Sequence, residues 1–162
     1  MPIIDYPFTT GNNLYSLPKP AVPLIIRNPA NGFDFSTWAL IDTGADSTAI
    51  PEFIAKKLYH DIRNHEVETD YHFGIGGQTK IFFHSFEMDI LNYNSKGEIL
   101  TDVAVHIPRT KLAVVPELHT VILGVKDFLE KYVLTINYPE TTFSLKRPSK
   151  NIKLSHVKYI LL

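Results

Sequence analysis

The chain has 162 residues, of which 44% are hydrophobic and 20% charged, and its formal net charge at pH 7 is −1. This length and composition suit one globular domain spanning residues 1–162, with a sizeable core. The near-neutral charge indicates no nucleic-acid or anionic-membrane partner, and the absence of cysteine excludes disulfides, thiol catalysis and thiolate metal sites. We find no leader and no membrane-length apolar run, so we predict a cytoplasmic protein, although a chain without cysteine would suit the periplasm or secretion equally.

The first third of the chain predicts a hairpin and a helix. Residues 1–20 contain four prolines, so we predict an irregular segment: an arm, a pro-segment or, as favoured here, a packed loop. Apolar runs at Val22–Arg27 and Phe33–Ile41 are separated by an Asn-Pro-Ala-Asn-Gly turn and predict a β-hairpin. A proline followed by an apolar stripe predicts a short helix over Pro51–Asp61.

Alternating hydrophobicity in the rest of the chain predicts antiparallel strands around one core. These strands lie at residues 66–71, 81–91, 98–107, 132–138 and 142–146. The glycine-rich residues 72–79 between the first two predict a hairpin tip. Residues 151–162 end the chain with an imperfect alternation, which fits either a dimer contact or an edge strand of the chain's own barrel.

The strongest chemical signal is the run Asp42-Thr43-Gly44, which directly follows a predicted strand and occurs once. Two carboxyls held against each other cannot both ionise, so they share one proton and can supply the acid and the base that peptide hydrolysis needs. Gly44 tolerates the backbone angles of a tight turn, and the Thr43 hydroxyl can form a hydrogen bond. For the tripeptide alone, the alternative is an ordinary Asp-capped turn.

Three motifs together resemble the retropepsin-like branch of the aspartic proteases. They correspond to the family's active-site loop, the tip of its flap, and a hydrophobic-hydrophobic-Gly strand that passes the loop before a short helix, here at 125–131. The residues concerned are Asp42, Thr43, Gly44, Ala45 and Asp46 in the loop, Gly74, Ile75, Gly76 and Gly77 in the flap, and Ile122, Leu123 and Gly124 in the strand. The motifs follow the family's order over about residues 21–145, with longer spacings that resemble cellular and bacterial members more than viral ones.

The resemblance implies an all-β, closed-barrel fold with one or two short helices, and a homodimer in which each chain contributes Asp42. It implies an aspartic endopeptidase that needs neither cofactor nor metal. Residues 43–46 would then shape the active-site loop, residues 74–77 would cover a peptide substrate, and residues 122–124 would support the loop. One departure is Val125, which stands where viral members carry an arginine that pairs with the second aspartate, so the partner of Asp46 stays open.

Two other hypotheses about the function also stay open, a binding module and a glycosidase. A retropepsin-like fold can serve as an inert dimerisation or peptide-binding module, which the Val125 departure allows. A monomeric β-barrel glycosidase could use Asp42 and Asp46, although their spacing in one loop does not fix the carboxyl separation that such a mechanism needs. The seven histidines form no His-x-His pair and no helical i, i+4 pair, so we predict no metal site.

Overall fold

The computed structural model describes residues 3–11, 17–64, 66–74 and 77–149. The elements in chain order are β1 (Ile3–Pro7), β2 (Ala21–Arg27), β3 (Asp34–Ile41), β4 (Ala49–Pro51), α1 (Glu52–Lys57), β5 (Thr69–Gly74), β6 (Gly77–Tyr93), β7 (Ile99–Val115), β8 (Val121–Leu123), the 3₁₀ turn η1 (Leu129–Lys131), β9 (Val133–Asn137) and β10 (Thr142–Lys146). The predicted all-β class with one or two short helices is confirmed. Within the described ranges, no helix has the length and apolar character needed to span a bilayer.

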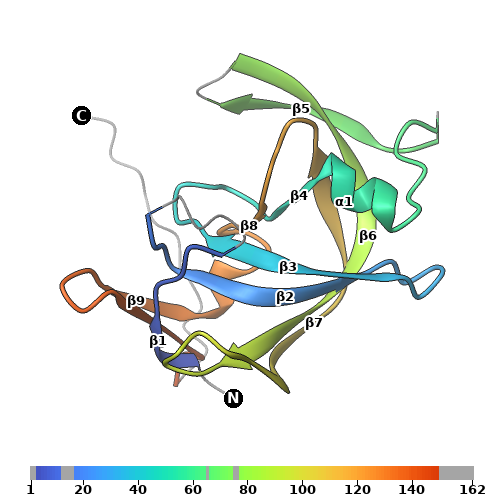
Figure 1. Cartoon of the computed structure of the whole chain (residues 1–162). Coiled ribbons are helices and arrows are strands. Elements are labelled where there is room, and N and C mark those ends of the chain that lie inside the picture. The colour runs from blue at the N-terminus through green and yellow to red at the C-terminus, as the bar shows by residue number, and fades with distance from the viewer. Residues whose placement is uncertain (1–2, 12–16, 65, 75–76, 150–162) are drawn as a thin grey trace, which may run out of the picture.

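Six strands close into a barrel (Figure 1). Their order is β2-β3-β8-β4-β7-β6, and β6 pairs back onto β2 with Leu24 opposite Ile90. β5 lies outside this ring and pairs only with β6 among the described strands. The predicted closed barrel is therefore confirmed, and closure covers strand edges that an open sheet would expose. The interior is filled by aliphatic side chains and by rings such as Phe86 and Phe128.

The two longest strands extend beyond their predictions. β6 and β7 each have 17 residues, whereas the sequence predicts strands at 81–91 and 98–107. Pro108 favours a break in β7, because proline cannot donate to a β-ladder. The pairing register instead places Pro108 and Arg109 opposite the single residue Glu87. This β-bulge accommodates the proline where the ladder is already interrupted, so β7 continues to Val115, where it pairs with β4.

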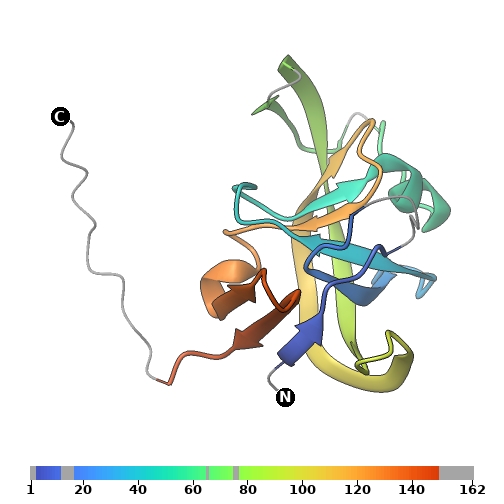
Figure 2. The ribbon, with the colours of Figure 1, turned by 60° about the vertical axis from the view of Figure 1, so that its left-hand side comes forward.

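The N-terminal segment differs from its prediction, because residues Ile3–Pro7 form β1 instead of an irregular stretch. β1 pairs antiparallel with β10, and β1, β10 and β9 form a separate three-stranded sheet beside the barrel (Figure 2). Tyr6 packs edge-on against Tyr93 of β6, with ring centroids 4.5 Å apart. An edge strand tolerates Pro7, which explains why this proline did not prevent pairing. The predicted C-terminal strand at 151–162 lies outside the described residues.

The first helix is shorter than predicted and covers Glu52–Lys57 instead of Pro51–Asp61. Pro51 is the N-cap residue and still belongs to β4. Tyr59 adopts a left-handed conformation with φ of 59°, and the His60 amide donates to the Ala55 carbonyl at 3.0 Å. This left-handed residue and the bond that closes behind it end the helix, a common form of C-terminal cap.

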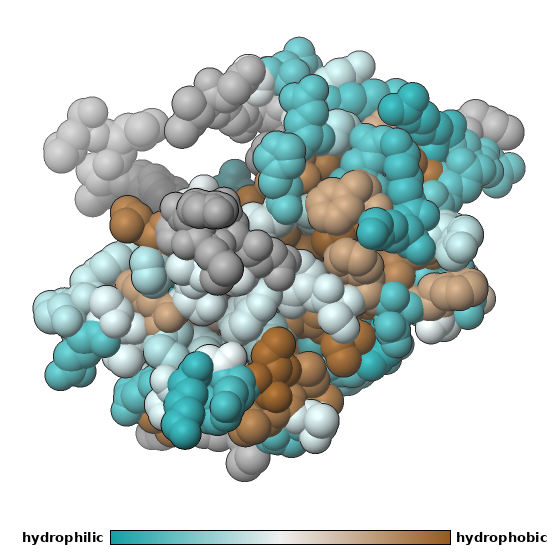
Figure 3. All heavy atoms as spheres, in the orientation of Figure 1, coloured by the Kyte–Doolittle hydropathy of each residue, from teal (hydrophilic) through white to brown (hydrophobic). Residues whose placement is uncertain are grey.

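Aromatic rings attach α1 to the hairpin of β2 and β3. The rings of Phe33 and Tyr59 lie 4.9 Å apart, and those of Phe35 and Phe53 lie 6.3 Å apart in an edge-to-face arrangement. The Lys57 ammonium lies 5.1 Å from the centre of the Phe35 ring. Figure 3 shows hydrophobic side chains exposed on this face among hydrophilic ones. The helix is therefore fixed on the barrel wall by surface rings as well as by its buried face.

A half-buried histidine pair lies between the end of α1 and β6. The rings of His60 and His84 lie 4.9 Å apart, and His60 also packs on Phe86 at 4.5 Å. Neither Nε2 atom has a hydrogen-bond partner in the part of the chain that the structure describes. Burial, followed by the charge of His84, lowers the pKa of His60 to about 4, and burial also lowers the pKa of His84 against the opposing effect of Asp61.

This pair predicts that acid weakens the fold. Between about pH 6.5 and pH 4 the unfolded chain binds a proton at His60 and the folded chain does not, so stability falls as pH falls through this range. Allowing for partial exposure, we expect His60 to account for on the order of 2 kcal/mol of this loss. Denaturant unfolding at a series of pH values should show that the unfolding free energy of His60→Phe falls less steeply with acid than that of the parent. The control is His119→Gln, at an exposed histidine, and its unfolding free energy should follow the parent. An unchanged decline in His60→Phe would contradict the assignment.

Candidate active site

The loop from Asp42 to Thr48 crosses over one end of β8. β3 pairs in parallel with β8, with Ile41 opposite Leu123, and β4 pairs antiparallel with the other edge of β8. The chain must therefore pass from one side of β8 to the other between β3 and β4. This crossing brings the loop and the residues that follow β8 into direct contact at the end of the barrel.

Asp42 is fixed at the start of this loop. Its amide donates to the Leu123 carbonyl at 3.2 Å. Its Oδ1 accepts a hydrogen bond from the Gly44 amide at 2.8 Å, which forms an Asx-turn. A Cβ at position 44 would lie 3.3 Å from Oδ1, so glycine leaves the carboxylate room. Asp42 is half-buried, while Thr43 and Gly44 are exposed. Its Oδ2 has no protein hydrogen bond within the described chain and is free to act on another group.

The segment after β8 packs backbone to backbone against the loop. A Cβ added to Gly124 would lie 2.3 Å from the Ser47 carbonyl oxygen and 2.8 Å from that of Ala45. The Gly124 amide donates to the Thr48 hydroxyl at 3.3 Å, and the Val125 amide donates to the Ala45 carbonyl at 2.9 Å. Only glycine fits this approach, because any side chain would overlap main-chain atoms of the loop.

Asp46 is held through its main chain. The Lys126 amide donates to the Asp46 carbonyl at 2.9 Å. The Asp46 side chain is exposed, and its carboxylate forms no ion pair with any residue that the structure describes. Val125 is also exposed, so this position contributes to the loop through its amide and not through a side chain.

Sequence reasoning missed two residues that lie at the other end of the loop. Thr48 is only 1% exposed, and its amide donates to Oδ2 of Asp127 at 3.2 Å. The two residues are 79 positions apart, so no local pattern links them. The available signal was a carboxylate in the turn that follows Gly124, next to a loop whose buried amides require acceptors.

The predicted helix at 125–131 is present only as the short η1, Leu129–Lys131. The amides of Leu129 and Glu130 donate to the carbonyls of Gly124 and Val125, five residues back in each case. These wide turns replace the four-residue spacing of an α-helix. They let the chain leave the loop contact and return to the core at Phe128, which is 1% exposed.

The predicted flap corresponds to the hairpin of β5 and β6. Gly74 and Gly77 pair at its end, and Gly77 has a φ of 103°, which favours glycine. Ile75 and Gly76, the predicted tip, lie outside the described residues. In Figures 1 and 2 the hairpin projects from the same end of the barrel that carries the loop from Asp42 to Thr48. The hairpin prediction is thus confirmed, while its action as a flap stays a prediction.

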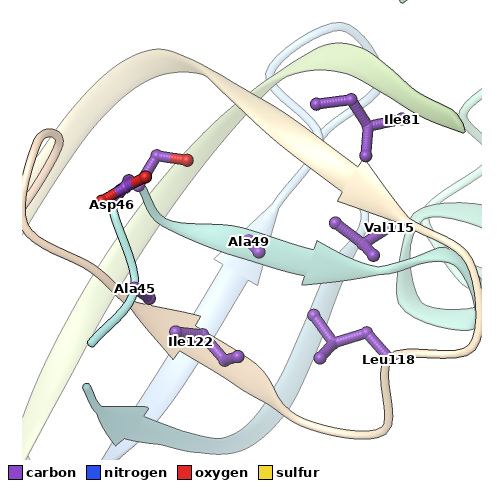
Figure 4. Close-up of a pocket in the computed structure, with 8 residues that line it drawn as sticks. Ala45, Asp46, Ala49, Ile81, Val115, Leu118 and Ile122 are labelled. Atoms are coloured by element: carbon purple, nitrogen blue, oxygen red, sulfur yellow. The ribbon is translucent and has the colours of Figure 1, made fainter. Parts of the chain in front are cut away.

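A small apolar cavity of about 160 Å³ lies beside the loop. Its walls are Ala45, Asp46, Ser47, Ala49, Ile81, Val115, Leu118 and Ile122, from the loop, β4, β6, β7, β8 and the connection between β7 and β8. Figure 4 shows Asp46 at one side of this group and the branched side chains of Ile81, Val115 and Leu118 at the other. The cavity can therefore take an apolar group, with a carboxylate at its edge. Across the described ranges, no three His, Asp or Glu side chains gather as a metal site would require.

Comparison with known proteins found similarity among solved structures only. The chain is 18% identical to a retropepsin-like aspartic protease from Rickettsia conorii, with a TM-score of 0.49 over 77% of this chain and 98% of that one. It is 21% identical to the EIAV protease in complex with the inhibitor HBY-793, with a TM-score of 0.43 over 69% and 85% of the two chains. No family model and no curated protein matches the sequence.

Proposed function

We propose that the protein is an aspartic endopeptidase that acts as a homodimer, with Asp42 of each subunit forming a catalytic pair. The observation that carries this proposal is the Asp42-Thr43-Gly44 turn at the end of β3, in which the Gly44 amide donates to the Asp42 carboxylate and the Asp42 amide donates to the Leu123 carbonyl of β8. A half-buried carboxylate on an exposed loop suits contact with another molecule. Because the chain contains this turn only once, a second copy of the chain is the source of the second carboxyl.

In the proposed mechanism the two carboxyls share one proton. The ionised member takes a proton from a water molecule, whose oxygen attacks the carbonyl carbon of the peptide bond while the neutral member donates its proton to the carbonyl oxygen. The roles then swap as the tetrahedral intermediate collapses: the newly protonated carboxyl gives its proton to the leaving nitrogen as the C–N bond breaks, and the other carboxylate takes a proton back from a hydroxyl of the intermediate. The hydrogen bond that the Gly44 amide donates to Oδ1 of Asp42 keeps the carboxylate oriented. Oδ2 of Asp42 is the oxygen left for the water or the partner's carboxyl. Thr43 contacts the partner loop, and no cofactor or metal takes part.

The surroundings of the loop suggest how a peptide binds. The cavity beside Ala45 is lined mainly by aliphatic side chains and suits one apolar side chain of the substrate. Gly74 and Gly77 lie at the end of the β5–β6 hairpin, the element that would close over the peptide. Gly76 or Gly77 would offer the peptide a backbone amide. A cytoplasmic location, as predicted from the sequence, is part of the same proposal.

The alternative is a dimerisation or peptide-binding module without activity. The exposed Asp46 carboxylate, which lacks an ion-pair partner in the described structure, is the observation that favours it. Cleavage of a mixed peptide library, with and without a statine-type transition-state analogue, separates the two proposals. Inhibitor-sensitive cleavage supports the protease, whereas a stable dimer that cleaves no peptide supports the module.

The shared-proton mechanism predicts a bell-shaped pH dependence on the acid side of neutrality. At high pH both carboxyls ionise and the acid is lost, while at low pH both are protonated and the base is lost. Initial rates of peptide cleavage from pH 3 to pH 9, measured after checking that the protein stays folded, test this expectation. A rate that rises steadily into the alkaline range would contradict the carboxyl pair.

A further inference from the structure

We propose that Asp127 is a positioning residue for Asp42, an inference that rests on the proposed function. The loop is attached at its start to the last residue of β8 and at its end to the segment that follows β8. At its start, the Asp42 amide donates to the Leu123 carbonyl at 3.2 Å. At its end, the Thr48 amide donates to the Asp127 carboxylate at 3.2 Å. The second attachment is made by a side chain, so a substitution can remove it without touching the main chain.

The Thr48 amide depends on this carboxylate. Thr48 is 1% exposed, so water cannot readily replace the lost acceptor, and a buried amide without a partner destabilises its conformation. The Thr48 hydroxyl accepts the Gly124 amide at 3.3 Å, so displacement of Thr48 also disturbs the close contact beneath the loop. Thr48 leads directly into β4, which fixes it to the barrel wall through Ala49.

Asp127 is itself held in place. The next residue, Phe128, is buried in the core, and the Lys131 ammonium donates to the Asp127 carbonyl at 2.8 Å. The turn around it is closed by the Leu129 amide, which donates to the Gly124 carbonyl at 3.0 Å. The main chain that carries the Asp127 side chain is therefore fixed. Its carboxylate holds the end of the loop in place by accepting the Thr48 amide.

The consequence for catalysis follows from geometry. Two carboxyls from two chains must approach closely, so a small shift of either loop separates the pair, and misplacement by about 1 Å can lower a rate by about 10²-fold. Asp127 does not reach the substrate in this role. Its loss should therefore lower kcat and leave KM almost unchanged. The role needs only an acceptor oxygen, which asparagine also provides.

The test compares Asp127→Ala, Asp127→Ser and Asp127→Asn with the parent, and uses Glu130→Ala as a control at an exposed acid nearby. We expect the alanine variant and the shorter serine variant to lose about tenfold or more in kcat, with KM within about threefold of the parent value. Asp127→Asn and Glu130→Ala should keep both constants within about threefold. Amide hydrogen exchange at Thr48 should accelerate in Asp127→Ala and Asp127→Ser alone.

A parental kcat in a folded Asp127→Ala or Asp127→Ser enzyme would overturn the positioning role, and so would an Asp127→Asn enzyme that is as slow as these variants. The serine variant keeps the test valid if the alanine variant does not fold. If the parent itself cleaves no peptide, the proposed function fails on its own, and the exchange measurement still applies to the contact. Unchanged Thr48 exchange in Asp127→Ala would then overturn the contact, and faster exchange would support it.

Discussion

Replacing Asp42 with asparagine should lower peptide cleavage by at least about 10³-fold, because both subunits of the proposed dimer would lose the group proposed to exchange protons with water and substrate. The fold should survive, since the asparagine oxygen can still accept the Gly44 amide that Oδ1 accepts in the parent. Initial rates on a cleaved library peptide, together with the denaturation midpoint of each protein, give the measurement. Loss of activity without loss of stability is the expected result.

The matched control is Asp34→Asn. It removes an exposed carboxylate at the first residue of β3, the strand whose other end leads into Asp42. We expect this variant to keep the parental rate. Cleavage that persists in Asp42→Asn would reject the carboxyl-pair mechanism, and an equal loss in both variants would point to a general effect of charge on the protein.

The second large effect is expected from Gly124→Ala. The added Cβ would lie 2.3 Å from the Ser47 carbonyl oxygen and 2.4 Å from its carbonyl carbon, and main-chain atoms on a crossing loop cannot rotate away. The loop and the strand must separate, so we expect a loss of about 3 kcal/mol in unfolding free energy together with most of the activity. Denaturant unfolding and cleavage rates measured on the same preparation test both parts.

Gly32→Ala provides the control for this substitution. Gly32 has a φ of 77° and no atom within 4 Å of an added Cβ, so its variant adds backbone strain without overlap. We expect a loss of about 1 kcal/mol and an unchanged cleavage rate. If Gly124→Ala were as stable and as active as Gly32→Ala, the close backbone approach beneath the loop would not exist in solution.

Local patterns were enough to predict the elements that deliver Asp42. The hairpin of β2 and β3 follows from two apolar runs around a turn, and β8 from a short apolar run that ends at Gly124. These features depend on neighbours in sequence, which is why they could be recognised without the structure. The barrel closure through β2 and β6 agrees with the predicted class.

Features that depend on distant partners were missed. β4 has only three residues, and its strand character comes from pairing with β7 and β8 on either side. β1 exists because β10 offers it a free edge, and β7 continues past Pro108 because a bulge removes the conflict. The bond between Thr48 and Asp127 joins positions that share no local signal. Tertiary contacts, and not propensity, decide each of these cases.

The central claim is that Asp42 supplies half of an active site, and subunit mixing tests it most directly. Parent and Asp42→Asn chains are mixed in equal amounts, allowed to exchange subunits, and assayed at the same total concentration as the parent alone. If only parent–parent dimers are active, about a quarter of the parental activity remains, because random pairing forms about one such dimer in four. Retention of about half of the activity would mean that each parent chain acts alone, and it would contradict the shared site.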